Sequence, residues 1–185
     1  MYRVLKRKIG YYHIWKNQRH QRRKKQVINL KTAKSIGIMF DATKPEDFDL
    51  VREFYNDLKK TVHVVSVLGF VNAKEVPSHY LFKKDFILFS KKMLNWFGKP
   101  ATQEVINFSK YPFDILINLT MVDHFVFDYI SGSSPARFKV GRYKQKPVYE
   151  DMMIHLEDSV SLEYFIELVT NYLETINRPE LSSNL

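Results

Sequence analysis

The order of apolar and polar residues divides the chain near residue 35. Beyond that point, short apolar runs rich in β-branched residues alternate with segments whose apolar residues recur every three or four positions. The first pattern is typical of buried strands and the second of amphipathic helices. Strands that alternate with helices form a mostly parallel sheet covered by helices. We therefore predict a Rossmann-like α/β domain over residues 35–178.

Six segments carry the strand pattern. They are residues 35–40, 61–70, 86–89, 114–120, 137–140 and 151–155. Four segments carry the helical pattern. They are residues 45–60, 102–110, 122–130 and 161–176. The first of these helices begins with proline and acidic residues, which suit the positive end of a helix dipole. The polar residues 179–185 are expected to form a frayed C-terminal tail.

Residues 1–34 are expected to form a separate, basic helical extension. Residues 2–27 contain no proline, and their apolar positions have helical spacing at Leu5, Ile9, Tyr12 and Trp15. Roughly 25 residues at ~1.5 Å each would extend ~37 Å, which is longer than packing on a small domain requires. The second half of this segment is almost wholly polar. We therefore predict one long helix whose second half projects away from the body.

Charge separates the same two parts. The 185 residues are 45% apolar, enough for one sizeable core, and carry a net charge of +9. Residues 1–40 hold 12 Lys and Arg and no Asp or Glu, whereas the other 145 hold 17 basic and 20 acidic residues, a net charge of −3. Such segregation indicates a local surface that binds anions, either nucleic acid or an anionic membrane.

Nucleic acid is the partner that the N-terminal segment favours. Its aromatic residues alternate with cations, a combination that suits phosphate contact and stacking on bases. An arginine-rich helix can enter a wide or distorted RNA groove. We expect a non-enzymatic RNA-binding accessory protein that associates with ribosomal RNA or a ribosomal particle. The residues expected to contact RNA are Arg3, Lys6, Arg7, Lys8, Tyr12, Trp15, Lys16, Arg19, Arg22, Arg23, Lys24 and Lys25.

A peripheral membrane module is the alternative. In that case Val4, Leu5, Ile9, Tyr12 and Trp15 would enter the interface while Lys and Arg contact anionic lipid. The apolar face is short, and the polar second half of the segment fits nucleic acid better. In either case the globular body is free to recruit a protein partner.

A third reading is a small enzyme or sugar-binding domain. Ligands of open parallel sheets bind outside the carboxyl ends of the strands. The polar residues expected at those ends are Asp41, Thr43, Asn118, Thr120, Asp123 and His124. These residue types also serve as helix caps and turn residues, so we assign no catalytic residue.

Several kinds of chemistry lack their sequence signals. The first predicted strand leads into FDATKPED, without the glycine-rich loop that cradles phosphates, so no nucleotide cofactor is expected. The spacing of Asp, Glu and His at residues 123–124 and 155–158 fits no recognised site, and no metal is expected. The absence of cysteine excludes disulfides and thiol catalysis and fits a reducing compartment, with the cytoplasm as the default.

Residues 111–142 resemble part of a known enzyme family. FDILINLT, a predicted helix and then SGSSPARFKVGR are similar to the N-terminal domain of heptosyltransferase-type glycosyltransferases. That resemblance implies half of a two-domain transferase, whose nucleotide-sugar site belongs largely to a second domain. The whole chain also resembles an uncharacterised bacterial family of small Rossmann-like proteins with basic N-termini, which implies no activity. Fold analogy does not establish function.

Overall fold

The computed structural model describes residues 2–21, 23–80, 85–145, 147–157 and 159–177. Its centre is an all-parallel sheet of six strands in the order β3-β2-β1-β4-β5-β6. The strands are β1 (Ser35–Asp41), β2 (Val64–Val71), β3 (Phe86–Ser90), β4 (Ile115–Asn118), β5 (Phe138–Arg142) and β6 (Met152–Ile154). This order confirms the Rossmann-like α/β fold.

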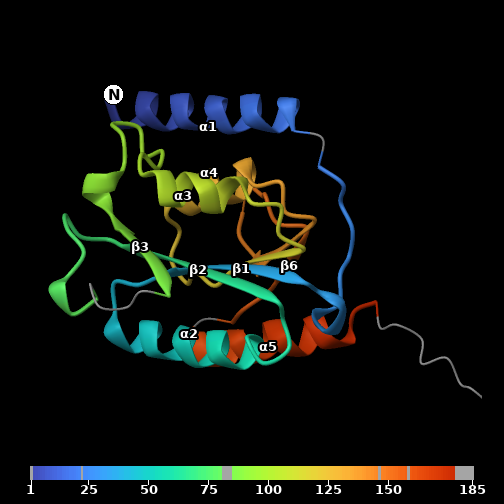
Figure 1. Ribbon diagram of the computed structural model, residues 1–185. Coiled ribbons are helices and arrows are strands. Elements are labelled where there is room, and N and C mark those ends of the chain that lie inside the picture. The colour runs from blue at the N-terminus through green and yellow to red at the C-terminus, as the bar shows by residue number, and fades with distance from the viewer. Residues whose placement is uncertain (1, 22, 81–84, 146, 158, 178–185) are drawn as a thin grey trace, which may run out of the picture.

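Helices make up the other layers. They are α1 (Tyr2–His20), α2 (Pro45–Leu58), α3 (Gln103–Lys110), α4 (Phe125–Ser133) and α5 (Leu162–Thr175), with short 3-10 helices at Leu30–Thr32, Ser78–Tyr80 and Lys91–Met93. Helices α2 and α5 cover one face of the sheet, α3 and α4 cover the other, and α1 lies across the outside of α3 and α4 (Figure 1). None of the described helices is long and apolar enough to span a membrane.

The sheet is buried on both faces, as the continuous apolar strand patterns indicate. In β1, Ile36, Ile38 and Phe40 belong to the core under α2 and α5. Met39, which points to the other face, belongs to the core under α3 and α4. The two cores fix the register of each strand, because a slip by one residue would exchange its faces.

The predicted elements of residues 35–176 are confirmed, with small shifts at their ends. The clearest difference is in α4, which begins at Phe125 and continues to Ser133, whereas the helix was expected over residues 122–130. Ser131 and Gly132 are buried within this last turn. Tertiary packing therefore holds in a helix a sequence whose local propensity favours a loop. The predicted tail at 179–185 lies outside the described residues.

The prediction of a helix that continues to Val27 and projects from the body is wrong. Helix α1 ends at His20 and packs against α4. Residues 23–29 then descend beside the sheet in an extended conformation (Figure 1). Polar residues do not prevent this arrangement, because the chain after α1 binds the body through hydrogen bonds as well as through the buried side chain of Ile28.

The extended segment connects α1 to the opposite side of the sheet, where it contacts the end of α5. The backbone N–H of Gln26 donates to the backbone carbonyl of Arg137 at 3.1 Å. The Asn29 amide group donates to the carbonyls of Glu174 and Ile176 at 2.9 and 2.8 Å, which satisfies groups at the C-terminal end of α5. Ile28 is buried in the core beneath α5. The basic N-terminal segment is thus held to the body through α1 and again through residues 26–29.

Candidate nucleic-acid interface

Helix α1 and helix α4 pack closely because each presents a glycine to the other. A Cβ atom at Gly10 would lie 2.2 Å from Cζ of Phe125, and one at Gly132 would lie 2.3 Å from Cγ2 of Ile14. The Ile14 side chain is fully buried. Phe125 therefore packs on the backbone of α1, while Ile14 packs on the backbone of α4. This reciprocal contact fixes which face of α1 is turned toward solvent.

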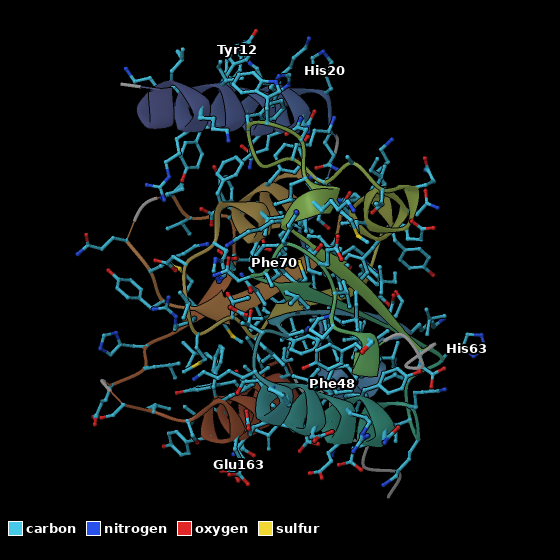
Figure 2. The ribbon with its side chains drawn as sticks, turned by 90° about the vertical axis from the view of Figure 1, so that its left-hand side faces the viewer. Tyr12, His20, Phe48, His63, Phe70 and Glu163 are labelled. Carbon is cyan, nitrogen blue, oxygen red and sulfur yellow. The ribbon has the colours of Figure 1, made fainter. Side chains whose placement is uncertain are left out.

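The face of α1 opposite this contact forms an outer stripe. Its members follow one another mostly at intervals of three or four residues, so they lie on one side of the helix, and all of them are exposed. They are Leu5, Lys8, Tyr12, Trp15, Lys16 and Arg19. Tyr12 is 57% exposed and Trp15 48% exposed. Figure 2 shows Tyr12 directed away from the body. The outer stripe therefore offers three cations and two aromatic rings on a single surface.

The aromatic rings and the cations of the outer stripe contact one another. The Arg19 guanidinium lies 4.4 Å from the ring centroid of Trp15, and the rings of Tyr12 and Trp15 are 5.8 Å apart. Stacking of this kind orders long exposed side chains before any ligand arrives. A base that stacks on such a ring would have a cation beside its phosphate.

The basic residues predicted to bind RNA fall into two groups. Arg23 is engaged with the body, since its guanidinium binds Asp151 and donates to the carbonyls of Ala136 and Arg137. Lys25 lies 3.5 Å from the same carboxylate of Asp151, although its side chain is 73% exposed.

The other group faces solvent. Lys8, Lys16 and Arg19 have no carboxylate partner among the described residues. Arg7 and Lys24 are also exposed, and Lys6 is half-buried. The side chains of Arg3 and Arg22 lie outside the described residues.

The opposite end of the molecule is acidic. A groove of about 670 Å³ runs between α2 and α5, and none of the described residues that line it is Lys or Arg. Its carboxylates are Glu53, Asp57, Glu163, Glu167 and Glu174. Figure 2 places Glu163 at the far end of the molecule from Tyr12. A polyanion is therefore attracted to the α1 side and repelled from the α2–α5 side.

The structure brings together most of the polar residues expected at the carboxyl ends of the strands. Asn118, Thr120, Asp123 and His124 line one cavity, and Asp41 reaches it through a 2.8 Å contact with His124 Nε2. Thr43 does not line the cavity, but its backbone amide donates to Asp41 Oδ1 at 2.9 Å, and its hydroxyl accepts a hydrogen bond from the backbone of Asn72.

The cavity at these strand ends has a volume of only about 10 Å³, little more than one water-sized probe occupies. Side chains from the end of β5 and from the segment after it line the cavity and pair with its other polar groups. Arg142 donates to Asp123 at 2.7 Å, and Lys144 contacts Asp128 at 2.6 Å. Glu150 accepts hydrogen bonds from Asn118 and Ser131, each at 3.1 Å. Sequence reasoning missed these residues, because no pattern in residues 142–150 indicated that the chain folds back over the strand ends.

The surroundings shift the pKa values of Asp41, at the end of β1, and of Lys139, within β5. Burial raises the pKa of Asp41, but hydrogen bonds from His124 and Thr43 outweigh burial and leave that pKa below its ordinary value. Burial of the Lys139 side chain, together with the nearby charge of Arg23, lowers the pKa of its ammonium group to about 7. The ammonium of Lys139 donates to the carbonyl of Ser131. Both groups are buried or half-buried and have partners within the protein. We therefore assign them to the stability of the folded state.

Comparisons with known proteins give the family and nothing finer. The model of a family of unknown function (DUF6913) matches residues 6–176, nearly the whole chain. Searches of curated proteins and of solved structures returned no match. Within the described residues, no group of three or more His, Cys, Asp or Glu side chains is placed to hold a metal ion.

Proposed function

The chain belongs to this family of unknown function, and from that premise we propose that the protein binds RNA through the outer stripe of α1. The observation that carries the proposal is the arrangement of Lys8, Lys16 and Arg19 around the exposed rings of Tyr12 and Trp15. Cations contact phosphates, and aromatic rings accept bases of any sequence. No enzymatic step is part of the proposal.

The docking of α1 changes how such binding would work. A free arginine-rich segment loses conformational entropy when it folds on RNA. Here Gly10 and Ile14 already hold α1 against α4, so the cations are presented by a rigid helix. Preorganisation of this kind improves affinity without new contacts. The binding surface should therefore recognise RNA without a change in the helical content of the protein.

Salt dependence is the first test. Six exposed cations, Arg7, Lys8, Lys16, Arg19, Lys24 and Lys25, are available to phosphates. Engagement of all six gives a log–log slope of affinity against salt of roughly −4 on single-stranded RNA and roughly −5 on duplex-like RNA. Fluorescence anisotropy with a short labelled oligonucleotide measures this slope. An affinity that does not change with salt would contradict the proposal.

A pair of matched double variants locates the surface. Lys8→Ala/Arg19→Ala removes two cations from the outer stripe, and Lys31→Ala/Lys34→Ala removes two exposed lysines near the start of β1. Both variants change the net charge by the same amount. The first should weaken RNA binding and reduce the slope on single-stranded RNA from roughly −4 to roughly −3, whereas the second should leave both unchanged. Equal effects would mean that net charge alone attracts RNA.

Ribosomal RNA is the first natural ligand to test, because it is the most abundant structured RNA available to such a surface. Co-sedimentation of the tagged protein with ribosomal subunits addresses this point. Sequencing of RNA crosslinked to the protein in cells identifies the ligand directly. Crosslinks confined to other RNA classes would retain RNA binding and reject the ribosomal assignment.

Binding to an anionic membrane is a second candidate, favoured by the 55% exposure of Leu5 beside the two aromatic rings. Against it, cations share the outer stripe with these apolar residues, whereas interfacial helices keep the two kinds of residue on separate faces. Leu5→Ser separates the two functions. It should leave RNA binding unchanged but abolish flotation with vesicles that contain phosphatidylserine, if such flotation occurs at all.

The ligand-binding reading that the glycosyltransferase resemblance suggested receives no support from the site. The cavity at the ends of β1 and β4 is far smaller than the 300–1,000 Å³, roughly, of pockets that hold organic ligands. Most of its polar groups already pair with one another, although the buried Nε of Arg142 has no hydrogen-bond partner among the described residues. We therefore do not propose a sugar nucleotide there.

A further inference from the structure

A second cavity, separate from the strand ends, lies where the C-terminal half of α1 faces α3. We call it the α1–α3 pocket, and its volume is about 620 Å³. Lys16 and His20 come from α1, Lys99 from the loop before α3, Lys110 from the end of α3, and Tyr129 from α4. Four separate parts of the chain therefore build this pocket, and it exists only because α1 is docked.

The charge of the α1–α3 pocket is entirely positive. Three lysines line it, and none of its lining residues, all within the described ranges, is Asp or Glu. Lys99 and Lys110 belong to the part of the chain whose net charge is −3, so the basic composition of the N-terminus does not explain them. Like charges around one concave surface repel one another, and a bound anion would remove that repulsion.

The remainder of the wall indicates what kind of anion fits. Pro100, Ile106 and the ring of Tyr129 provide an apolar surface, which a bare phosphate ion would not use. The Asn17 amide is held in place, because it donates to Tyr129 Oη at 3.3 Å and to Ser133 Oγ at 3.0 Å. A cavity of this size is large enough for a phosphate joined to a sugar and a base.

We propose that the α1–α3 pocket binds a nucleoside phosphate. The lysines hold the phosphate, and the apolar wall accepts the base or sugar. The side-chain oxygen of Asn17 offers a fixed hydrogen-bond acceptor, since both N–H groups of this amide are already donated to Tyr129 and Ser133. Lys16 belongs both to this pocket and to the outer stripe, so the two surfaces are continuous. The inference rests on the proposed RNA binding only for the source of the nucleotide, which is either a free nucleotide or a nucleotide of the bound RNA.

Isothermal titration of the full chain with each of the four ribonucleoside 5′-diphosphates, and with the four nucleosides, tests the pocket. At least one diphosphate should bind at least about tenfold more tightly than its nucleoside, because charged hydrogen bonds hold the phosphates. Lys99→Ala/Lys110→Ala should weaken that diphosphate by about tenfold or more. Lys99→Arg/Lys110→Arg keeps the charge and should retain most of the affinity. Lys31→Ala/Lys34→Ala should have no effect.

These variants test the outer stripe and the α1–α3 pocket independently of each other. Lys8→Ala/Arg19→Ala lies outside the pocket and should leave diphosphate binding unchanged while it weakens RNA binding. If no diphosphate binds, or if Lys99→Ala/Lys110→Ala binds as the wild type does, the pocket proposal is overturned even where RNA binding persists. Thermal unfolding of each variant shows that a loss of binding is not a loss of fold.

Competition assigns the source of the nucleotide. If RNA supplies it, the diphosphate displaces labelled RNA, and Lys99→Ala/Lys110→Ala weakens RNA binding as well. If the ligand is a free nucleotide, the same variant loses the diphosphate and keeps RNA. Both results support the pocket as a nucleoside phosphate site and differ only in where the nucleotide comes from.

Discussion

Replacement of Gly10 by alanine tests whether α1 is docked on the body, on which both proposed surfaces depend. In a helix exposed to solvent, Gly→Ala stabilises a protein by about 1 kcal/mol, because alanine has the higher helix propensity. At Gly10 the new methyl group would lie 2.2 Å from Cζ of Phe125, whereas carbon atoms in contact are about 3.5–4.0 Å apart. The substitution therefore forces Phe125 or the whole helix to move.

Phe125 has little room to move. Its ring packs edge-on against Tyr11, with centroids 5.3 Å apart, and a Cβ at Gly98 would lie 2.9 Å from its Cδ1. Overpacking of this kind costs about 1–3 kcal/mol. That cost equals or exceeds the propensity gain, so Gly10→Ala should lower the free energy of unfolding by about 0–2 kcal/mol. Gln18→Ala, at an exposed position of the same helix, should change it by less than about 0.5 kcal/mol.

A second substitution makes the test more specific. At Gly132 an added Cβ would lie 2.3 Å from Cγ2 of the buried Ile14, so the same outward shift of α1 would relieve both clashes. The destabilisation of Gly10→Ala/Gly132→Ala should therefore be smaller than the sum of the two single changes. Urea unfolding measures the free energies. Limited digestion with trypsin measures the accessibility of α1, and cleavage within α1 should become faster in each glycine variant.

The refuting result is a simple one. If Gly10→Ala stabilises the protein by about 1 kcal/mol and trypsin cleaves α1 no faster, then α1 behaves as an exposed helix. The α1–α3 pocket would then lose its wall, while the outer stripe would remain as a property of a free helix.

Three further predictions concern single side chains. Trp15→Ala should weaken RNA binding by about fivefold to a hundredfold, since stacking on an aromatic ring contributes about 1–3 kcal/mol per base, and Trp15→Phe should retain most of the affinity in the anisotropy assay. The pKa of Lys139 is lowered to about 7 in the folded protein, so above pH 7 the unfolded chain binds more protons than the folded one. The free energy of unfolding of the wild type should therefore rise by about 2 kcal/mol between pH 7 and pH 9. Urea unfolding measures this rise, and Lys139→Met should lose it. The pKa of Asp41 lies below its ordinary value, so its contribution to stability is present above about pH 4 and is lost as the pH falls through the folded pKa. The stability difference between wild type and Asp41→Asn should therefore shrink in acid, and a difference independent of pH would contradict the contact with His124.

Much of the fold followed from local patterns. Helix α2 buries Phe48, Val51, Phe54, Tyr55 and Leu58, the residues that its 3.6-residue periodicity selects. The strands were recognisable because both faces of a parallel sheet are buried, which gives continuous apolar runs. These features depend on neighbours a few residues away, and the sequence contains that information directly.

The position of α1 depended on contacts that no local pattern reveals. Gly10 and Gly132 are 122 positions apart in the chain, and only their meeting in space turns two unfavourable helix residues into a packing surface. The prediction used Leu5, Ile9, Tyr12 and Trp15 to identify the helix, yet Ile9 is only partly buried and the other three face solvent, whereas Ile14 is fully buried. Apolar spacing identified the helix correctly but did not indicate which of its faces packs on the body.

The same long-range dependence explains the pocket. Lys99 and Lys110 are unremarkable in the sequence, since single lysines usually belong to a solvated surface. They gain significance only when α1 places Lys16 and His20 opposite them without a carboxylate in between. A free basic segment would need only cations for its affinity, so it would not need a body shaped to receive it. The docked helix forms a cavity with that body, and this construction favours a ligand with defined dimensions over a general attraction to polyanions.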